Sequence, residues 1–120
     1  MKQKVHSVSY LAKAEFEFKN GVYDLVALPT GAEVVKVSLE LVGNLMDGSI
    51  INVGFKDELT KDYFLNLTST VTANTITSAK DYTATSNKVI VAEVKNTNSN
   101  DIKCVLRVLY FLPSVIEVEY

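Results

Sequence analysis

The stretch from Lys13 to Lys19 reads KAEFEFK and alternates between apolar and charged residues without interruption. In an extended chain, successive side chains point to opposite faces, so a period of two separates the apolar set from the charged set. The stretch therefore predicts a β-strand with one buried face and one charged face. The same alternation returns in residues 32–42, which read AEVVKVSLELV.

Turn signals around these stretches divide the chain into further short strands. Asn20-Gly21 directly follows the first stretch and is a strong sequence signal for a tight hairpin. Pro29-Thr30-Gly31 combines a residue of fixed φ with one that permits a tight turn. Strands are expected at residues 22–28, 32–42, 49–55, 62–67, 89–94, 102–112 and 115–120, short edge strands within the Thr-, Ser- and Asn-rich stretch 68–88, and exposed turns at 44–48 and 95–101.

This pattern predicts a single all-β domain over residues 1–120. About eight to nine short strands are typical of an antiparallel β-sandwich, here expected to be jelly-roll-like, and a closed barrel is the alternative. Residues 1–10 and 114–120 are expected to be N- and C-terminal arms, because Pro113 interrupts the last core strand. The residues expected in the core are Val35, Val37, Leu39, Leu41, Val91, Leu106 and Val108.

Composition excludes several classes of protein. Hydrophobic residues make up 48% of the 120-residue chain, which excludes global disorder, and the net charge of −2 lacks the basic footprint of a nucleic-acid binder. Apolar runs are far shorter than the roughly 20 residues of a membrane-spanning helix, so no membrane partner is expected. Charged residues within the first twenty positions argue against a secretory signal peptide.

The residues that could carry chemistry do not form a recognisable constellation. His6 is the only histidine and Cys104 the only cysteine, so neither a nucleophile–base pair nor a disulfide can be assembled from sequence. The acidic pairs Asp57-Glu58 and Glu117/Glu119 lack the spacing of a known cation-binding loop. No catalytic, cofactor-binding or metal-binding residue is predicted, and the expected function is non-enzymatic.

The segment from Ile102 to Leu112 carries apolar residues on both faces. Its even positions suit the core, yet its odd positions still offer large apolar side chains, and sizeable exposed apolar patches usually mark interfaces. The terminal alternation after Pro113 could add as a strand to a neighbour's sheet. The candidate interface residues are therefore Val105, Leu109, Phe111, Ile116, Val118 and Tyr120.

Three short motifs, in this order, resemble a known class of phage proteins. Residues 28–32 read LPTGA before a hydrophobic strand, residues 53–57 read VGFKD with Tyr63-Phe64-Leu65 following, and residues 105–110 form a Val-rich strand around Arg107. Over residues 22–112 the chain resembles the head decoration, or cement, proteins of tailed bacteriophages.

The resemblance implies a β-sandwich without a catalytic site that binds the outer surface of the capsid lattice. It implies two partners, the major capsid protein and further copies of the chain in a homotrimer, with synthesis in the host cytoplasm and a final location on the virion. Two alternatives stay open: a tail, neck or baseplate component, and a carbohydrate-binding sandwich that uses tyrosine side chains.

Overall fold

The computed structural model describes residues 2–43, 48–68, 75–97, 102–113 and 115–119, and these residues form strands and turns without a helix. The strands are β1 (Lys2–His6), β2 (Ser9–Glu17), β3 (Gly21–Leu28), β4 (Glu33–Val42), β5 (Ile50–Phe55), β6 (Leu65–Thr68), β7 (Thr75–Ser78), β8 (Tyr82–Thr83), β9 (Lys88–Lys95), β10 (Lys103–Phe111) and β11 (Val115–Glu119). Within the described residues, no helix is long and apolar enough to cross a membrane.

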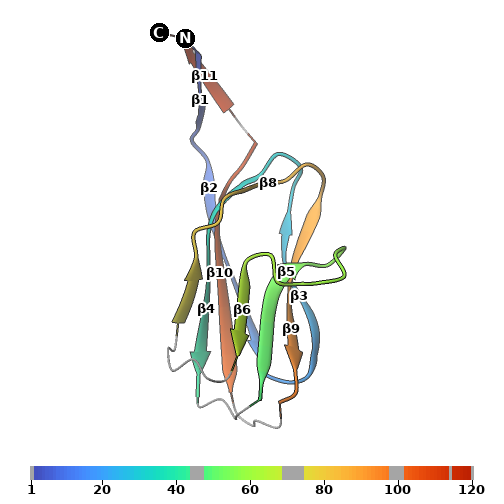
Figure 1. Cartoon of the computed structure of the whole chain (residues 1–120). Helices are drawn as coiled ribbons and strands as arrows, with labels where there is room; N and C mark the ends of the chain where they lie inside the picture. The colour runs from blue at the N-terminus through green and yellow to red at the C-terminus, as the bar shows by residue number, and fades with distance from the viewer. Residues whose placement is uncertain (1, 44–47, 69–74, 98–101, 114, 120) are drawn as a thin grey trace.

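Two antiparallel sheets form a sandwich (Figure 1). One sheet has the strand order β2-β10-β4-β7, with β8 also pairing with β4, and the other has the order β3-β9-β5-β6. We call them the β10 sheet and the β9 sheet after their inner strands. The chain passes from one sheet to the other between β2 and β3, β3 and β4, β4 and β5, β6 and β7, β8 and β9, and β9 and β10. The predicted all-β sandwich is confirmed.

The predicted hairpin at Asn20-Gly21 is wrong. The strands on either side of it lie in different sheets, because β2 pairs with β10 while β3 pairs with β9. The Asn20 side chain instead holds the backbone of Thr97: its Nδ2 donates to the Thr97 carbonyl at 3.1 Å and its Oδ1 accepts from the Thr97 N–H at 3.0 Å. Asn20-Gly21 therefore marks the connection at which the chain passes from one sheet to the other.

Most of the predicted core residues are buried between the sheets, and one is displaced by a bulge. Val37, Leu39, Leu41, Leu106 and Val108 are at most 5% exposed. Val35 is only half-buried, since the register of β4 against β10 shifts so that Lys36 faces Leu109 and Val34 faces Tyr110. This β-bulge turns Val34 into the core, where it is 0% exposed.

Val91 is fully buried, although it lies outside the core cluster between the sheets. In β9 it pairs with Gly54 of β5, on the outer face of the β9 sheet. The backbone of Lys61 and Asp62 lies directly on Gly54, so that a β-carbon there would come within 2.6 Å of the Lys61 carbonyl carbon. The connection from β5 to β6 therefore folds back over its own sheet.

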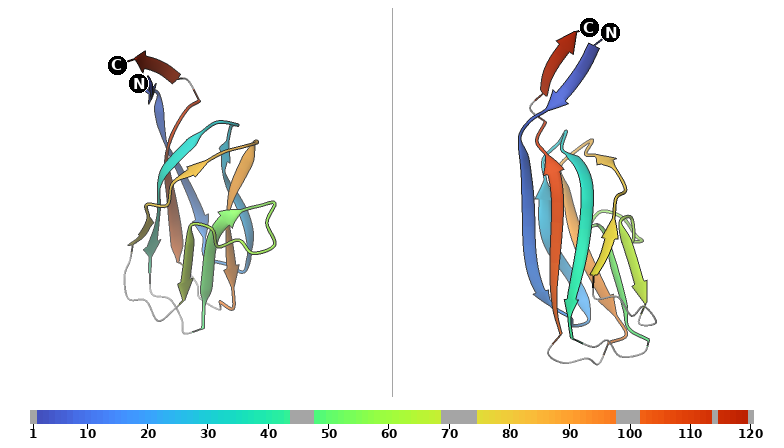
Figure 2. Two further views of the ribbon diagram at one scale, coloured as in Figure 1. Left: turned by 45° about the horizontal axis from the view of Figure 1, so that its top comes forward. Right: turned by 90° about the vertical axis from the view of Figure 1, so that its left-hand side faces the viewer.

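The two terminal strands leave the sandwich together. β1 pairs antiparallel with β11, from Lys2 opposite Glu119 to His6 opposite Val115, and the two form a ribbon that projects from one end of the molecule (Figures 1 and 2). The described residues span 55 × 26 × 19 Å as a result. The two terminal segments, predicted as N- and C-terminal arms, pair with each other in the structure.

The Thr- and Asn-rich stretch contributes short strands at the edge of a sheet. β7 closes the β10 sheet on the far side of β4, and β8 adds two residues beside the same strand. β6 begins at Leu65, later than the predicted start at residue 62. Residues 69–74, and most of the predicted turns at 44–48 and 95–101, lie outside the described residues.

Candidate interaction surface

The outer face of strand β10 is the first candidate surface. β10 lies between β2 and β4, and its inward residues Cys104, Leu106 and Val108 are fully buried. The predicted interface residues Val105, Leu109 and Phe111 alternate with them and stay half-buried on the outer face. An inner strand therefore presents a row of large apolar side chains to the outside of the sandwich.

The neighbouring strands turn the centre of this row into a hollow. Leu11 of β2 lies opposite Leu109 in the sheet register and is 62% exposed. Together with Lys36, Ser38 and Arg107, these two leucines line a hollow of about 260 Å³, which we call the leucine hollow. It is an apolar socket with two cationic side chains at its rim.

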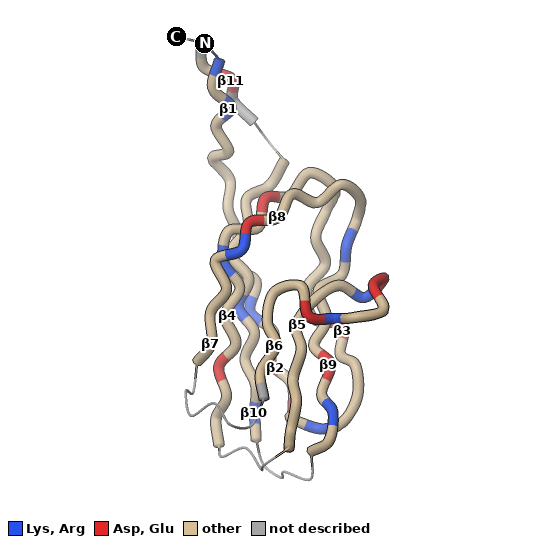
Figure 3. Tube along the Cα trace, in the orientation of Figure 1, with Lys and Arg blue, Asp and Glu red and all other residues tan. Residues whose placement is uncertain are grey.

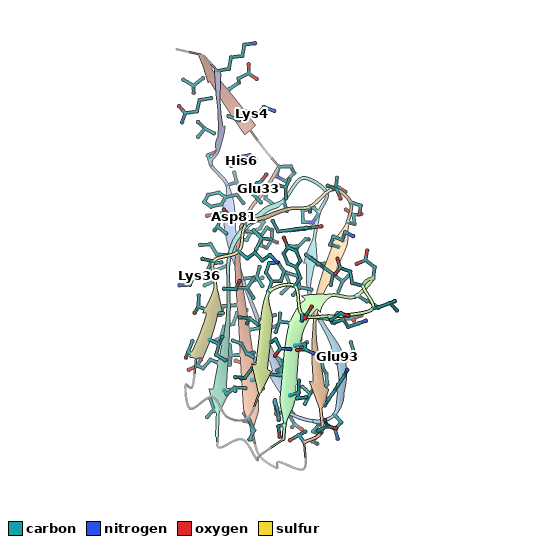
Figure 4. All side chains as sticks on the ribbon, viewed as in Figure 1. Lys4, His6, Glu33, Lys36, Asp81 and Glu93 are labelled. Carbon is teal, nitrogen blue, oxygen red and sulfur yellow. The ribbon has the colours of Figure 1, made fainter. Side chains whose placement is uncertain are left out.

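Charge is unevenly distributed around the leucine hollow. Arg107 donates to the Glu40 carboxylate at 3.0 Å, and Lys13 lies opposite Arg107 in the register of β2 against β10. Lys36 is exposed, and Figure 4 shows its side chain directed away from the sandwich. Lys13 is paired with Glu15 and Arg107 with Glu40, which leaves Lys36 as the rim cation that suits an apolar group carrying negative charge.

A second hollow lies farther along the same sheet and has a different character. It is about 280 Å³ in volume and is lined by Glu15, Phe16, Glu17, Val42, Lys103, Cys104 and Val105. Glu17 also receives a hydrogen bond from Lys19, which lowers the pKa of its carboxyl below 4.5. The outer face of the β10 sheet thus runs from a basic region around Lys36 to a more acidic one around Glu15 and Glu17.

The β1–β11 ribbon is the second candidate surface. The alternation along β1 places Gln3 and Val5 on one face and Lys2 with Lys4 on the other. Val118, opposite Gln3, is 41% exposed, and Lys2 Nζ lies 3.4 Å from the Glu117 carboxylate. A two-stranded ribbon without a packed face is at most marginally stable in water, so this ribbon suits packing against a partner.

The root of the ribbon is tied to the sandwich through Leu112. Its N–H donates to the Val8 carbonyl at 2.8 Å, and its own carbonyl lies 3.0 Å from Nδ1 of His6. Figure 4 places His6 at this root, where the ribbon meets the sandwich. His6, the only histidine, therefore contacts a backbone carbonyl at the root of the ribbon.

The predicted interface residues do not form one patch. Val105, Leu109 and Phe111 lie on the β10 sheet, whereas Val118 lies on the ribbon. Ile116 pairs with Val5 through its backbone, its side chain is not described, and Tyr120 lies outside the described residues. Leu11 was not predicted as an interface residue, although it lies opposite Leu109 on the outer face of the sheet. The next outward residues of β2, Lys13 and Glu15, are charged, so the sequence pattern indicated a charged outer face.

A third feature is the loop between β5 and β6, which the sequence analysis did not propose as an interface. Lys56, Asp57, Glu58, Leu59 and Thr60 are exposed, and Leu59 at 101% exposure has the most accessible large apolar side chain described. Figure 3 shows this loop as a projection marked by alternating positive and negative residues. We call residues 56–62 the Leu59 loop.

Tyrosines and phenylalanines near this loop pack on one another. Phe55 lies 4.6 Å from Tyr82 and 5.2 Å from Tyr63 between ring centroids, and Lys80 Nζ lies 3.8 Å from the centroid of Tyr63. The cluster closes one end of the sandwich. Its rings are occupied by each other and do not form the flat stacking platform that a sugar-binding site uses.

The described titratable residues are spread over the molecule, and the most strongly shifted of them is Cys104. Burial raises the pKa of the Cys104 thiol to about 12, which keeps it protonated and unreactive at neutral pH. Among the residues that the structure describes, no three His, Cys, Asp or Glu side chains lie close enough to hold a metal ion. What the described residues offer is exposed apolar surface on a β-sandwich, as in a structural module.

Comparison with known proteins gives that module a biological setting. The chain shares 70% identity with a chain of the acidic stable capsid structure of Helicobacter pylori bacteriophage KHP30, over 100% of both chains and with a TM-score of 0.92. The protein belongs to the same family as that chain and is a capsid-associated structural protein of a bacteriophage virion.

A second solved structure is similar in fold. A chain of the cyanophage Pam1 capsid asymmetric unit matches 88% of this chain and 85% of its own length, with 24% identity and a TM-score of 0.69. Neither the family models nor the curated proteins that were compared match the sequence. The predicted relationship to phage capsid proteins is confirmed.

Proposed function

We propose that the protein is a capsid decoration protein that binds the outer surface of the major capsid protein lattice and cements neighbouring capsomers. In this proposal it acts as a homotrimer at local three-fold positions and catalyses no reaction. The family relationship and the distribution of apolar surface on the sandwich support it.

The observation that carries the proposal is the apolar outer face of β10. Burying each large aliphatic or aromatic side chain stabilises a complex by about 1.5–3 kcal/mol relative to leaving it exposed. Leu11 and Leu109 lie side by side on this face, with Val105 and Phe111 along the same strand. For a capsid-associated protein, the surface that can cover such a face is another protein of the shell.

The ribbon supports the same proposal because it extends the reach of a small domain. A sandwich with an arm at one end can seat its body on one capsomer while the arm contacts another. Several weak contacts made at once on a lattice give an avidity that exceeds each single affinity by roughly 10²-fold or more. Each contact can therefore stay small, at or below the roughly 800 Å² per partner of a standard interface.

The proposal of a non-enzymatic role rests on the state of the nucleophilic and basic groups. Cys104 faces the core, and Nδ1 of His6 lies against the Leu112 carbonyl. The two groups lie on different strands, and neither is placed beside the other.

Imaging of purified virions tests the proposal directly. We expect three-fold clusters of this protein on the outer shell, and we expect that particles stripped of it rupture at a lower temperature and regain stability when the purified protein is added back. Density for the chain in the tail, neck or baseplate, or particles equally stable without it, would contradict the cement function.

A further inference from the structure

We infer that the Leu59 loop of one copy docks in the leucine hollow of a neighbouring copy, with Leu59 between Leu11 and Leu109 and Glu58 facing Lys36. This inference rests on the proposed function, because it names the contact that joins copies within the proposed trimer. It follows from the loop's construction, the exposure of its tip, and the match between its chemistry and that of the hollow.

The Leu59 loop is anchored at its start by two ion pairs. Lys56 Nζ lies 2.7 Å from the Asp24 carboxylate, and Lys88 Nζ lies 2.6 Å from the Asp57 carboxylate, so that β3 and β9 both hold the first two residues of the loop. Lys61 Nζ also donates to the Glu58 carbonyl at 2.7 Å. A loop held in this way loses little conformational entropy on binding, which favours its use as a contact.

Gly54 fixes how the loop returns to the sheet. The Lys61 carbonyl carbon and carbonyl oxygen would lie 2.6 Å and 2.9 Å from a β-carbon at this position. Only a residue without a side chain lets the backbone settle on β5 so closely. This close contact fixes where the loop rests on the β9 sheet and the direction in which its tip projects.

The tip of the loop presents an acidic apolar knob. Leu59 is fully exposed between Glu58 and Thr60, which are exposed as well. Glu58 directly precedes Leu59, and the neighbouring Lys56 and Asp57 are engaged in ion pairs with Asp24 and Lys88. A single exposed leucine is common on protein surfaces, but one on a braced projection is suited to insertion.

The leucine hollow has the complementary properties. Leu11 and Leu109 supply apolar walls, and Lys36 and Arg107 supply positive charge at the rim. Like-charge contact at an interface costs several kcal/mol, whereas opposite charge fixes the register of two partners. An acidic knob thus fits this hollow better than a neutral or basic one does.

A second copy is the occupant because the chain carries both halves of the contact. The hollow belongs to the β10 sheet and the loop follows β5 of the β9 sheet, so the two surfaces face different directions in one molecule (Figures 1 and 2). Such a contact is heterologous: it uses two different patches and can close into a ring of copies. A ring of three is the assembly proposed above.

Paired cysteines test the contact. A chain with Leu59→Cys and Ser38→Cys places one thiol on the knob and one on the floor of the hollow, and mild oxidation should link copies up to a covalent trimer, both in solution and on particles. The matched control combines Leu59→Cys with Val22→Cys, an exposed position on β3, and should give no covalent trimer. The buried native Cys104 does not compete for oxidation.

Charge exchange gives an independent test. Glu58→Lys and Lys36→Glu should each weaken self-association roughly tenfold or more, and the double variant should recover most of the loss. Sedimentation measures the association, and circular dichroism verifies that each variant folds. Failure of the double variant to recover would overturn the inference, as would cross-linking of Leu59→Cys to the shell protein in place of a second copy.

The outcomes separate this inference from the proposed function. Protein that still binds particles at three-fold positions without the Leu59–Ser38 cross-link refutes the inter-copy contact and leaves the cement function standing. Protein that cross-links into trimers in solution but is absent from the outer shell refutes the cement function and leaves the contact standing.

Discussion

Gly31 lies directly against Pro113, and a β-carbon on Gly31 would come within 2.8 Å of the proline Cβ. The glycine belongs to the LPTGA turn before β4, and the proline follows the last residue that ties the ribbon root to the sandwich. The backbone at Gly31 has φ of +87°, a conformation that other residues adopt at a cost. Gly31 therefore serves both the turn before β4 and the packing of Pro113 at the root of the terminal ribbon.

Gly31→Ala should destabilise the protein by more than its backbone angle alone requires. The positive φ costs roughly 1–2 kcal/mol for a residue with a β-carbon, and displacement of Pro113 adds to this. Gly48→Ala is the matched control, since Gly48 has φ of +86° with no atom within 4 Å of an added β-carbon. Urea unfolding should show a larger loss for Gly31→Ala; equal losses would mean that the proline contact carries no energy.

Leu106→Ala and Leu109→Ala should separate stability from assembly, because the two leucines lie on opposite faces of β10. Leu106 is 0% exposed, so its truncation should cost about 2–5 kcal/mol of unfolding free energy. Leu109→Ala should cost about 1 kcal/mol or less in the monomer and reduce binding to particles. Thermal melts and particle co-sedimentation on the same preparations distinguish these results, and a severe melting defect for Leu109→Ala would place it in the core.

Removal of residues 114–120 should leave the sandwich folded and weaken assembly. β11 pairs with β1 and with no other described strand, so neither sheet loses a member. We expect a cooperative melt close to that of the full chain, together with reduced retention on particles. Global unfolding of the truncated protein would show that the ribbon supports the core.

The Asp57–Lys88 ion pair should persist into mildly acidic conditions. The hydrogen bond from Lys88 lowers the pKa of the Asp57 carboxyl below its ordinary value of 3.8. Since the folded value lies below the unfolded one, the brace is present above pH 3.8 and is lost as the pH falls through the lowered value. NMR titration of the carboxyl should find this low midpoint, and Lys88→Met should move it back up.

Cys104 should resist thiol reagents in the folded protein. Its pKa of about 12 and its complete burial leave almost no accessible thiolate at pH 8. Labelling with a disulfide reagent should be slow in buffer and fast in denaturant. Fast labelling of the native protein would indicate that the β10 sheet opens, and would also complicate the paired-cysteine experiment.

The strands could be predicted from sequence because residues such as Phe16 and Leu106 repeat with the period of a pleated chain. Strand partners could not, because Asn20-Gly21 carries the same local signal at a corner as in a hairpin. The bulge at Val35 was also invisible, since Val34 and Val35 are chemically equivalent and the choice depends on the register of β10. Where two neighbouring residues are identical, tertiary contacts decide which of them faces the core.

The residues of the candidate surfaces were also only partly predictable from the sequence. The outward position of Val105 and Leu109 could be predicted because they are surplus to a core that the alternation had already filled. Leu59 was not proposed because a lone leucine among charged residues has no period, and the ion pairs that anchor its loop, Lys56–Asp24 and Lys88–Asp57, join residues far apart in sequence. Braced loops of this kind emerge only once the strands that hold them are placed.

The pairing of β2 with β10 also sets the order of events during synthesis. Residues 9–17 have their sheet partner at residues 103–111, so β2 cannot pair in its sheet until β10 has been synthesised. Folds dominated by such distant pairings form slowly compared with those built from local ones. The leucine hollow, whose walls are Leu11 and Leu109, therefore forms only after β10 has been synthesised and has paired with β2.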